Sequence, residues 1–388
     1  MYITHICLTG PYTDGWNYQD NMLTKYHAKM GLSVTVLAPN WSYNEKGHLT
    51  KTESGEYTDS NGVKIIRIST NDVYHKFKRY KNLGIKLAES HPDILFIHGC
   101  QFLDMDVIVK YLKSHPNIRV YVDNHADFSN SGTNLLSKNI LHKGFWKRSA
   151  QIINPYTTKF YGVLPARVDW LVNMYGLPRE KCELLVMGAD DEKVKEAYED
   201  GWKSKIRGQY GIEGDDFLIM TGGKIDAWKT QTILLMEAVK RIDNPKVKLI
   251  VFGSVTSELK DRVNALVDGN KVQYIGWVKS EDSYYYWAAC DLAVFPGRHS
   301  VFWEQVAGMG IPMVCKYWDG TTHVDVGGNV VFLKEDSIDE IENAISILTS
   351  DGLNKYKTMK TVAEGQGKNM FSYMEISKRA LEETVAVK

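Results

Sequence analysis

The sequence lacks any long hydrophobic run, since no stretch approaches the roughly 18 apolar residues that a membrane-spanning helix needs. Its opening residues, MYITHICLTG, lack the basic start and the extended apolar core of a signal peptide, so they are predicted to form a first strand. Positive charge is not in excess either, because Lys plus Arg and Asp plus Glu both number 47. We therefore expect a cytoplasmic protein that has no nucleic acid partner.

Cysteine is scarce and follows no pattern, since the five cysteines form no CxxC pair and no Cys/His spacing typical of a zinc site. Most of them lie in or beside apolar stretches that resemble strands, where a small buried thiol is the simplest interpretation. We expect a reducing compartment, and no cofactor is predicted. The five are Cys7, Cys100, Cys182, Cys290 and Cys315.

At 388 residues the chain exceeds what one hydrophobic core usually supports, so two domains are expected. In both halves, apolar runs of strand length alternate with segments of helical spacing. This alternation predicts an α/β fold of two doubly wound, mostly parallel sheets with a cleft between them. The predicted domains are 1–200 and 201–365, with 366–388 as a C-terminal helix that packs back on the first domain.

The predicted elements follow this alternation, with a polar excursion at 40–62 and a linker at 191–214. Strands are predicted at 3–8, 32–38, 63–68, 94–98, 119–122, 151–154, 182–186, 217–221, 247–252, 272–274, 291–295, 314–317 and 329–333. Helices are predicted at 18–30, 80–90, 104–114, 282–289, 338–348 and 358–387, and before residues 242 and 267.

Acidic residues are absent from Phe128 to Val168, although six cations lie there. Within this segment, residues 135–148 (LLSKNILHKGFWKR) combine Leu, Ile, Phe and Trp with Lys and Arg, as an interfacial amphipathic helix would. An anionic membrane surface is therefore a candidate partner, and the protein would then be peripheral on the inner face of the membrane. A solvated basic face over an ordinary core helix explains the same pattern.

The stretch 295–314 (FPGRHSVFWEQVAGMGIPMV) reads as a strand end, a Pro-Gly turn and a helix that stops at Gly310. Ser300 is predicted to cap that helix. Glu304 then lies in the first helical turn, where its carboxylate could accept both hydroxyls of a ribose while the helix end faces a pyrophosphate. The alternative is that Glu304 only complements the helix dipole.

A second glycine-containing stretch, Gly222-Gly223-Lys224, follows a predicted strand, and Lys229 opens the next helix. Glycines permit close approach of a ligand, and two cations near one helix N-terminus suit a diphosphate. The spacing is not that of a P-loop.

Four segments in order, FLIMTGGKIDAWKTQTILLMEAV, KLIVFGS, VQYIGWVKSEDSYYYWAACDLAVFP and WEQVAGMGIPMV, resemble the donor domain of GT-B glycosyltransferases, specifically the large retaining family four. ELLVMGADD and MGLSVTVLAP are similar to earlier parts of that family. The resemblance implies two Rossmann-like domains, a nucleotide-sugar donor, most simply a UDP-sugar, no metal requirement and retention at the anomeric carbon.

The resemblance also implies roles for individual residues. Lys224 and Lys229 would hold the diphosphate and neutralise the leaving group, and Glu304 would bind the ribose. His125 would lie near the sugar at the domain interface. The further donor-binding candidates are Gly15, Gly223, Val278, His299, Ser300 and Val301, and the acceptor-side candidates are Trp16, Asn17, His98 and Asp127.

One departure from the family pattern concerns its two glutamates eight positions apart, because Pro296 stands eight residues before Glu304. The main hypothesis is a hexosyltransferase that acts on a saccharide or lipid-linked acceptor in surface glycan or polysaccharide synthesis. The missing glutamate motivates a second hypothesis, a catalytically silent partner subunit that binds glycan or protein. A nucleotide-sugar epimerase is the third, although no paired carboxylates for proton abstraction are evident.

Overall fold

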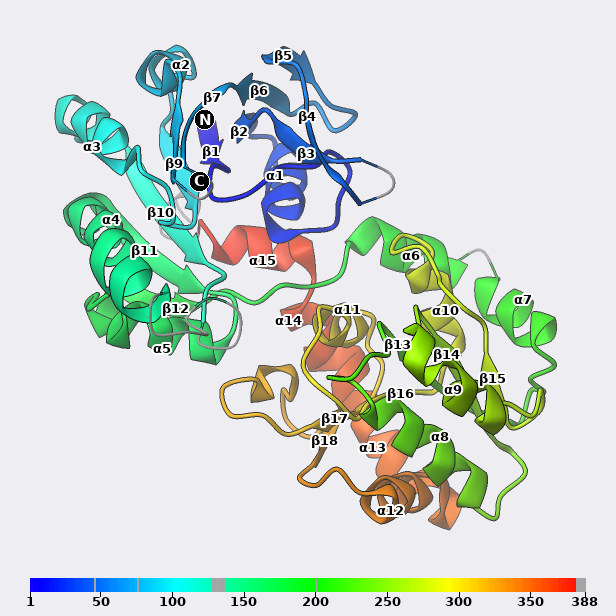
Figure 1. The fold of residues 1–388 in the computed structure, drawn as a ribbon. Helices are drawn as coiled ribbons and strands as arrows, with labels where there is room; N and C mark the ends of the chain where they lie inside the picture. Colours follow the sequence, from blue (N-terminus) through cyan, green and yellow to red (C-terminus); the bar gives the residue numbers. More distant parts are fainter. Residues whose placement is uncertain (45–46, 75–76, 128–130, 132–136, 200, 382–388) are drawn as a thin grey trace. The chain divides into compact units, whose positions relative to one another are not determined.

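A computed structural model describes residues 1–44, 47–74, 77–127, 131, 137–199 and 201–381 (Figure 1). The chain divides into two compact units, each of which is described by itself. The first comprises Met1–Val186 together with the residues from Ile376 onward, and the second comprises Met187–Glu375.

The first unit is built on an eight-stranded sheet in the order β12-β11-β10-β9-β1-β2-β6-β5. All neighbouring strands are parallel except β5 and β6, which pair antiparallel at one edge. The strands are β1 (Tyr2–Ile6), β2 (Ser33–Pro39), β5 (Gly55–Thr58), β6 (Lys64–Ile68), β9 (Ile94–His98), β10 (Arg119–Asn124), β11 (Thr157–Gly162) and β12 (Cys182–Leu184). The helices are α1 (Gln19–Lys29), α2 (Leu83–Glu89), α3 (Met105–Ser114), α4 (Lys147–Ile153) and α5 (Pro165–Asn173).

The centre of this sheet is where its topology reverses. Strand β1 pairs with β2 on one side and with β9 on the other, so successive loops leave the sheet in opposite directions at the carboxyl ends of β1 and β9. Such a switch point is where open α/β sheets bind ligands. His98 ends β9 at this edge, and every residue of β9 is buried.

The second unit has a six-stranded, fully parallel sheet in the order β15-β14-β13-β16-β17-β18, with its own switch point between β13 and β16. The strands are β13 (Phe217–Gly222), β14 (Val247–Phe252), β15 (Val272–Tyr274), β16 (Leu292–Phe295), β17 (Met313–Lys316) and β18 (Val330–Leu333). The helices are α6 (Asp191–Glu199), α7 (Trp202–Gln209), α8 (Gln231–Arg241), α9 (Lys260–Leu266), α10 (Ser283–Ala289), α11 (Phe302–Gly308), α12 (Ile338–Thr349), α13 (Asn354–Val362) and α14 (Lys368–Met370).

The predicted fold class is confirmed in both units, and several strands match their predicted ranges closely. Strands β9, β14 and β15 begin and end where they were predicted. Their apolar, β-branched runs are bounded by polar or turn residues, so the first and last residue of each strand can be predicted from the sequence.

Three predicted elements are wrong. Residues 151–153 belong to α4 and Asn154 begins a 3-10 turn, and the strand follows at Thr157–Gly162. The charged segment 191–214 is not a linker, because α6 and α7 occupy it and bury a narrow face that includes Val194 and Ile206. The C-terminal helix is broken into α13, a π-helical turn at Ala363–Gly367, α14 and α15 (Tyr373–Arg379).

The polar excursion at 40–62 also contains short antiparallel strands. These are β3 (Trp41–Tyr43) and β4 (Leu49–Lys51), along with β5, and a further hairpin follows from β7 (Thr70–Tyr74) and β8 (Phe77–Tyr80).

The division between the units falls at Val186/Met187, earlier than the predicted boundary at 200/201. The boundary falls earlier because the segment before α6 already packs in the second unit. There the amide of Ala189 donates to the carbonyl of Phe371 (2.8 Å), and the amide of Asp190 donates to the Tyr284 hydroxyl (2.9 Å). At the C-terminus, the chain groups with the first unit only from Ile376 onward.

Candidate functional site

The loops that leave β13 and β14 lie backbone against backbone in the second unit. The amide of Gly223 donates to the carbonyl of Phe252 at 3.0 Å. A Cβ on Gly253 would lie 1.8 Å from the Gly223 carbonyl oxygen, and a Cβ on Gly222 would lie 2.4 Å from the Phe252 ring. Only glycine fits at these two positions, and this lets the two loops pack closely at the carboxyl end of the sheet, where the Cβ position of Gly223 faces open space.

Three cations gather beside these loops. Lys224 and Lys229 follow β13, and Arg298 follows the neighbouring strand β16. Burial lowers the pKa of Lys229, the nearby charges of Arg298 and Lys224 lower it further, and Asp226 partly offsets them. The cations must therefore lie near one another.

Their partners leave part of this positive charge uncompensated. Lys224 forms an ion pair with Asp226 (3.3 Å), whereas Lys229 and Arg298 form none within the described residues. Arg298 instead lies over the ring of Trp228, 5.0 Å from its centroid, and that ring is 69% exposed. The cluster can bind an anion such as a diphosphate. Sequence reasoning missed Arg298 and Trp228, which no pattern of spacing links.

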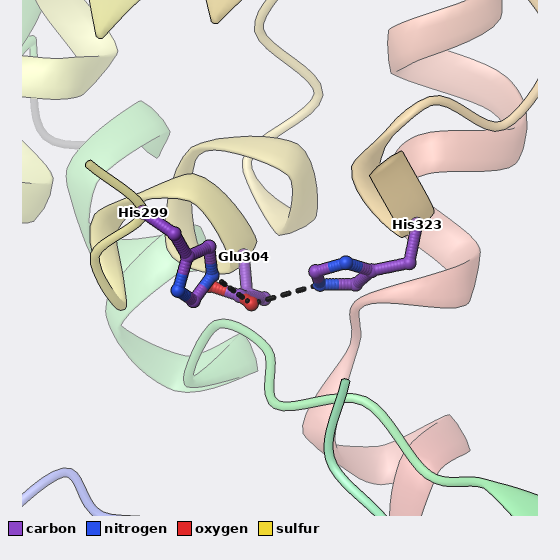
Figure 2. Close-up of side chains that lie close together, drawn as sticks. All are labelled: His299, Glu304 and His323. Atoms are coloured by element: carbon purple, nitrogen blue, oxygen red, sulfur yellow. Dashed lines mark hydrogen bonds and ion pairs between the residues drawn. The ribbon is translucent and has the colours of Figure 1, made fainter. Parts of the chain in front are cut away.

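Glu304 lies in α11 at the carboxyl end of β16 and is fully buried. One oxygen, Oε1, is held by two histidines: it lies 2.7 Å from His299 Nε2 and 2.9 Å from His323 Nε2 (Figure 2). Burial by itself raises the pKa of this carboxyl, but the two histidines outweigh that effect and lower it strongly. Glu304 is therefore a carboxylate clamped from two sides.

The clamp limits what Glu304 can bind. Its second oxygen, Oε2, is buried without a hydrogen-bond partner, and it is the oxygen left to accept a hydroxyl. His323 comes from the turn at Thr322–Val324, 19 residues beyond Glu304 along the chain, and sequence reasoning did not detect it. His299, which was predicted to bind the donor, contacts Glu304 itself.

The same three side chains are a candidate set for a metal ion, because their ligand atoms lie within 4.8 Å of one another. However, metal-bound histidines almost always donate their other ring N–H to an acceptor, whereas Nδ1 of His323 is buried without a partner. The atoms also stand at hydrogen-bond distance. A hydrogen-bonded clamp therefore accounts for the cluster better than a metal centre does.

The residues around Glu304 correct one prediction and leave others untested. Ser300 does not cap α11, since the helix begins one residue later with Val301 at the cap position and no side-chain cap bond. Ser300 contributes only its carbonyl, which accepts from the amide of Trp303 (3.0 Å). Val301 is half exposed, and Val278 follows β15 at the same sheet edge, next to Trp277, which is 68% exposed.

In the first unit, two predicted residues are joined by a third that the sequence did not single out. Asp123, near the end of β10, is fully buried, and its Oδ2 lies 2.7 Å from His98 Nδ1 and 3.4 Å from His125 Nε2. His125 is 42% exposed at its side chain. Burial by itself raises the pKa of Asp123, but the two histidines lower it strongly. A carboxylate thus connects a buried histidine to an accessible one at the switch point.

The other first-unit candidates occupy loops at the same sheet edge. Gly15 has φ 74° in the loop after β1, a conformation that favours glycine. Trp16 stacks on Tyr43, with ring centroids 5.2 Å apart and planes 2° apart, while Asn17 is exposed. Asp127 is buried and its carboxylate accepts from Arg167 Nε (2.9 Å), so it is engaged by a partner within the unit.

Comparisons with known proteins agree with this picture. Residues 216–351 match the family model described as Glycosyl transferases group 1. A stretch of 149 residues is 27% identical to the mannosylfructose-phosphate synthase of Agrobacterium fabrum, and this stretch spans 36% of the chain and 32% of that relative's length.

Solved structures resemble the whole chain. The Anabaena protein Alr3699/HepE in complex with UDP superposes with a TM-score of 0.66 at 16% identity and full coverage of both chains. The sucrose-phosphate synthase of Thermosynechococcus elongatus superposes with a TM-score of 0.65 at 13% identity, covering 100% of this chain and 99% of that one. At such identities the likeness establishes the fold, which is the two-domain architecture of these proteins.

Proposed function

Residues 216–351 form a Glycosyl transferases group 1 domain within a chain of GT-B fold, and from this premise we propose that the protein is a retaining glycosyltransferase. The donor is a nucleoside diphosphate sugar, with UDP as the nucleotide, and the acceptor is a saccharide or a lipid-linked saccharide in surface glycan or polysaccharide synthesis. No metal or cofactor takes part.

The observation that carries this proposal is the cation cluster at the carboxyl end of β13, beside the glycine-containing loops. Lys224 and Lys229 supply positive charge where the donor's diphosphate leaves, so they stabilise the charge that develops in the transition state. Gly223, where a Cβ would meet nothing within 4 Å, leaves its backbone open to that diphosphate. UDP is chosen because the Anabaena neighbour was solved with it.

Thermal unfolding with UDP, GDP, ADP and their sugars tests the donor site. A ligand at 100 times its dissociation constant stabilises the fold by about 2.7 kcal/mol, so the matching nucleotide raises the midpoint clearly. The double substitution Lys224→Ala and Lys229→Ala should abolish the rise. Lys360→Ala is the matched control, because Lys360 lies in α13 and pairs only with Glu364. A rise that survives the double substitution contradicts the assignment.

Transfer itself is tested with acceptor panels and NMR of the product's anomeric configuration. Retention supports the proposed reaction class, and inversion contradicts it. Full activity after exhaustive chelation is the expected outcome for a reaction without metal.

A second candidate function is favoured by the clamp on Glu304. The glutamate proposed to bind ribose is fully buried, and one of its oxygens is already held by His299 and His323. If that clamp is permanent, the protein serves as a silent partner subunit of an active transferase. Nucleotide binding without turnover, together with a stable complex that stimulates another transferase, would establish this alternative.

We also propose that the protein associates with an anionic membrane surface from the cytoplasmic side. Of the segment 135–148, residues 135 and 136 lie outside the described residues, and Ser137–Trp146 form a π-helix. Ile140 and Phe145 are about half exposed there, beside the cations Lys143 and Lys147. No helix in the described ranges is long and apolar enough to cross a bilayer. Flotation with anionic vesicles at low salt tests the proposal, and Phe145→Ser should weaken the binding.

A further inference from the structure

Three buried histidines of the first unit form one continuous hydrogen-bonded chain. His98 Nε2 lies 2.9 Å from His5 Nδ1, and His5 Nε2 lies 3.0 Å from His27 Nδ1. All three rings are at least nine-tenths buried, and they surround the ring of Phe96. The chain therefore lies within the core, below the switch point of the sheet.

At both ends, the row of histidines meets a group that can only accept a hydrogen bond. At one end, His98 Nδ1 lies 2.7 Å from Asp123 Oδ2, and at the other, His27 Nε2 lies 3.2 Å from the carbonyl oxygen of Ser377. A carboxylate and a carbonyl have no proton to give. The two terminal ring nitrogens must therefore both be N–H donors.

Counting protons then fixes the charge. Four hydrogen bonds, two at the ends and two between rings, need four N–H groups. Three neutral imidazoles carry only three, because each neutral ring has one N–H and one lone pair. No choice of tautomers satisfies all four bonds, so one ring must be an imidazolium.

The charges around the three histidines determine which ring carries the extra proton. Asp123 contacts His98 directly, and Asp20 at the start of α1 also acts on it. Together they outweigh the burial that by itself lowers the pKa of His98, and the net shift is upward. Burial lowers the pKa of His5 and of His27, so those rings stay neutral. The remaining titratable groups that face this site are His125 after β10, Cys7 after β1 and Cys100 after β9.

We propose that His98, His5 and His27 form a proton-loaded chain whose single excess proton resides on His98, and that this imidazolium holds Asp123 as the carboxylate that positions His125. In this proposal all three are positioning residues, so His98 acts through Asp123 in place of the acceptor-side contact predicted from the sequence. The positioning of His125 rests on the proposed function, together with the resemblance that implies a place for His125 near the transferred sugar. The excess proton on the three histidines does not depend on the proposed function.

Two substitutions at His5 separate the charge from the packing. In His5→Gln, the amide oxygen accepts from His98 and the amide nitrogen donates to His27, so four donors are still required and the excess proton stays. In His5→Phe, the ring volume and the stacking on Phe96 remain, but the two inner bonds are lost. Two neutral rings then satisfy the two ends, and the excess proton is no longer needed.

The decisive measurement is long-range ¹H–¹⁵N NMR of protein labelled with ¹⁵N-histidine at pH 7, with His98 assigned by the loss of its signals in His98→Gln. We expect both ring nitrogens of His98 to be protonated in the wild type and in His5→Gln, and only Nδ1 to be protonated in His5→Phe. A wild-type His98 that carries one proton at pH 7 would overturn the proposal, whether or not any transferase activity is found.

Kinetics with the donor identified by thermal unfolding tests the positioning role. His5→Phe should lower kcat/KM by about 100-fold through misplacement of His125 and shift the pH profile, while His5→Gln stays near the wild type. His142→Phe is the matched control, because it removes another buried histidine whose ring bonds the Tyr175 hydroxyl outside the chain. Equal losses in His5→Phe and His5→Gln, or no loss in either, contradict a role set by the proton.

Discussion

Each unit of this protein buries one carboxylate against two histidines, and the two clusters differ in what lies behind the histidines. In the first unit, His98 continues into the chain that ends at Ser377, and this chain requires an extra proton. In the second unit, Nδ1 of His323 ends without a partner, so the hydrogen bonds around Glu304 require no extra proton. The hydrogen bonds of the first cluster thus require a cation beside the carboxylate, whereas those of the second cluster do not.

This difference gives the two carboxylates different tasks. Asp123 is compensated and fixed, which suits a group that orients its neighbour His125. Glu304 needs no cation to complete the hydrogen bonds around it and has an acceptor without a partner at Oε2, which suits a group that binds hydroxyl donors. A carboxylate left charged and incompletely hydrogen-bonded in a protein interior is unfavourable for stability, and a bound ligand can repay that cost.

The largest effect should come from removing the compensated carboxylate. In Asp123→Ala, the His98 imidazolium loses its counter-charge in the core, so we expect the free energy of unfolding to fall by about 3–5 kcal/mol. Urea denaturation followed by tryptophan fluorescence measures it. Asp106→Ala is the control, since Asp106 is largely exposed and stands 3.8 Å from Arg79, and its loss should cost under about 1 kcal/mol. Similar costs for both substitutions would show that Asp123 has no buried ionic partner.

Removing the charge of the second carboxylate should affect binding more than folding. Glu304→Gln keeps an oxygen for the two histidines but weakens acceptance of hydroxyls, because hydrogen bonds to charged groups are worth about 1.5–3 kcal/mol. We expect donor affinity to fall by more than about tenfold in calorimetric titration. His299→Gln serves as the comparison, since it loosens the clamp while keeping the carboxylate. Unchanged affinity in Glu304→Gln would remove Glu304 from the donor site.

The same two clusters show which site residues can be predicted from the sequence and which cannot. Glu304, His98 and His125 were predicted because each follows an apolar strand or opens a helix, and such local patterns survive in the fold. Asp123 and His323 were missed, since Asp123 lies within a strand that reads as core, and His323 is brought to Glu304 by a turn whose path no local pattern encodes. His5 and His27 read as ordinary residues of a strand and a helix.

Corrections to the fold have the same physical origin. The strand predicted at 151–154 is helical because short apolar runs fit either element, and only the next run, at Thr157–Gly162, finds a partner in β10. Helices α6 and α7 were missed because each buries only a narrow face, which a highly charged sequence hides. Tertiary pairing decides such segments, and spacing along the chain does not report it.

The pH dependence of stability should separate the histidine chain from the carboxylates. His27 has its pKa lowered by burial to about 3, so the unfolded chain binds its proton first as the pH falls below about 6.5. The free energy of unfolding should therefore decrease with falling pH from about 6.5 down to about 3, by up to about 1.4 kcal/mol per pH unit for each such histidine. The pKa values of Asp123 and Glu304 are lowered in the folded protein, so these carboxylates reduce the free energy of unfolding only below about pH 4.

Denaturation curves of the wild type and His27→Gln between pH 4.5 and 7 measure this slope. The variant should be less steep by about one proton, because Gln does not titrate. His115→Gln is the control, since His115 lies on the surface of the first unit and its ring bonds only the Tyr111 carbonyl. Parallel slopes in the wild type and His27→Gln would mean that His27 is not held neutral in the folded protein.

The smallest effect is expected from metal removal. If the second cluster is a hydrogen-bonded clamp, exhaustive dialysis against a chelator should leave the thermal midpoint unchanged, and added Zn²⁺ should not raise it. A bound metal would behave differently, since it stabilises the fold in proportion to the logarithm of its concentration over its dissociation constant. A drop in the midpoint that Zn²⁺ restores, and that is absent in His323→Ala, would make the cluster a metal centre. The two carboxylates would then be alike after all, each neutralised by a cation, with a proton on His98 in one unit and a metal ion in the other.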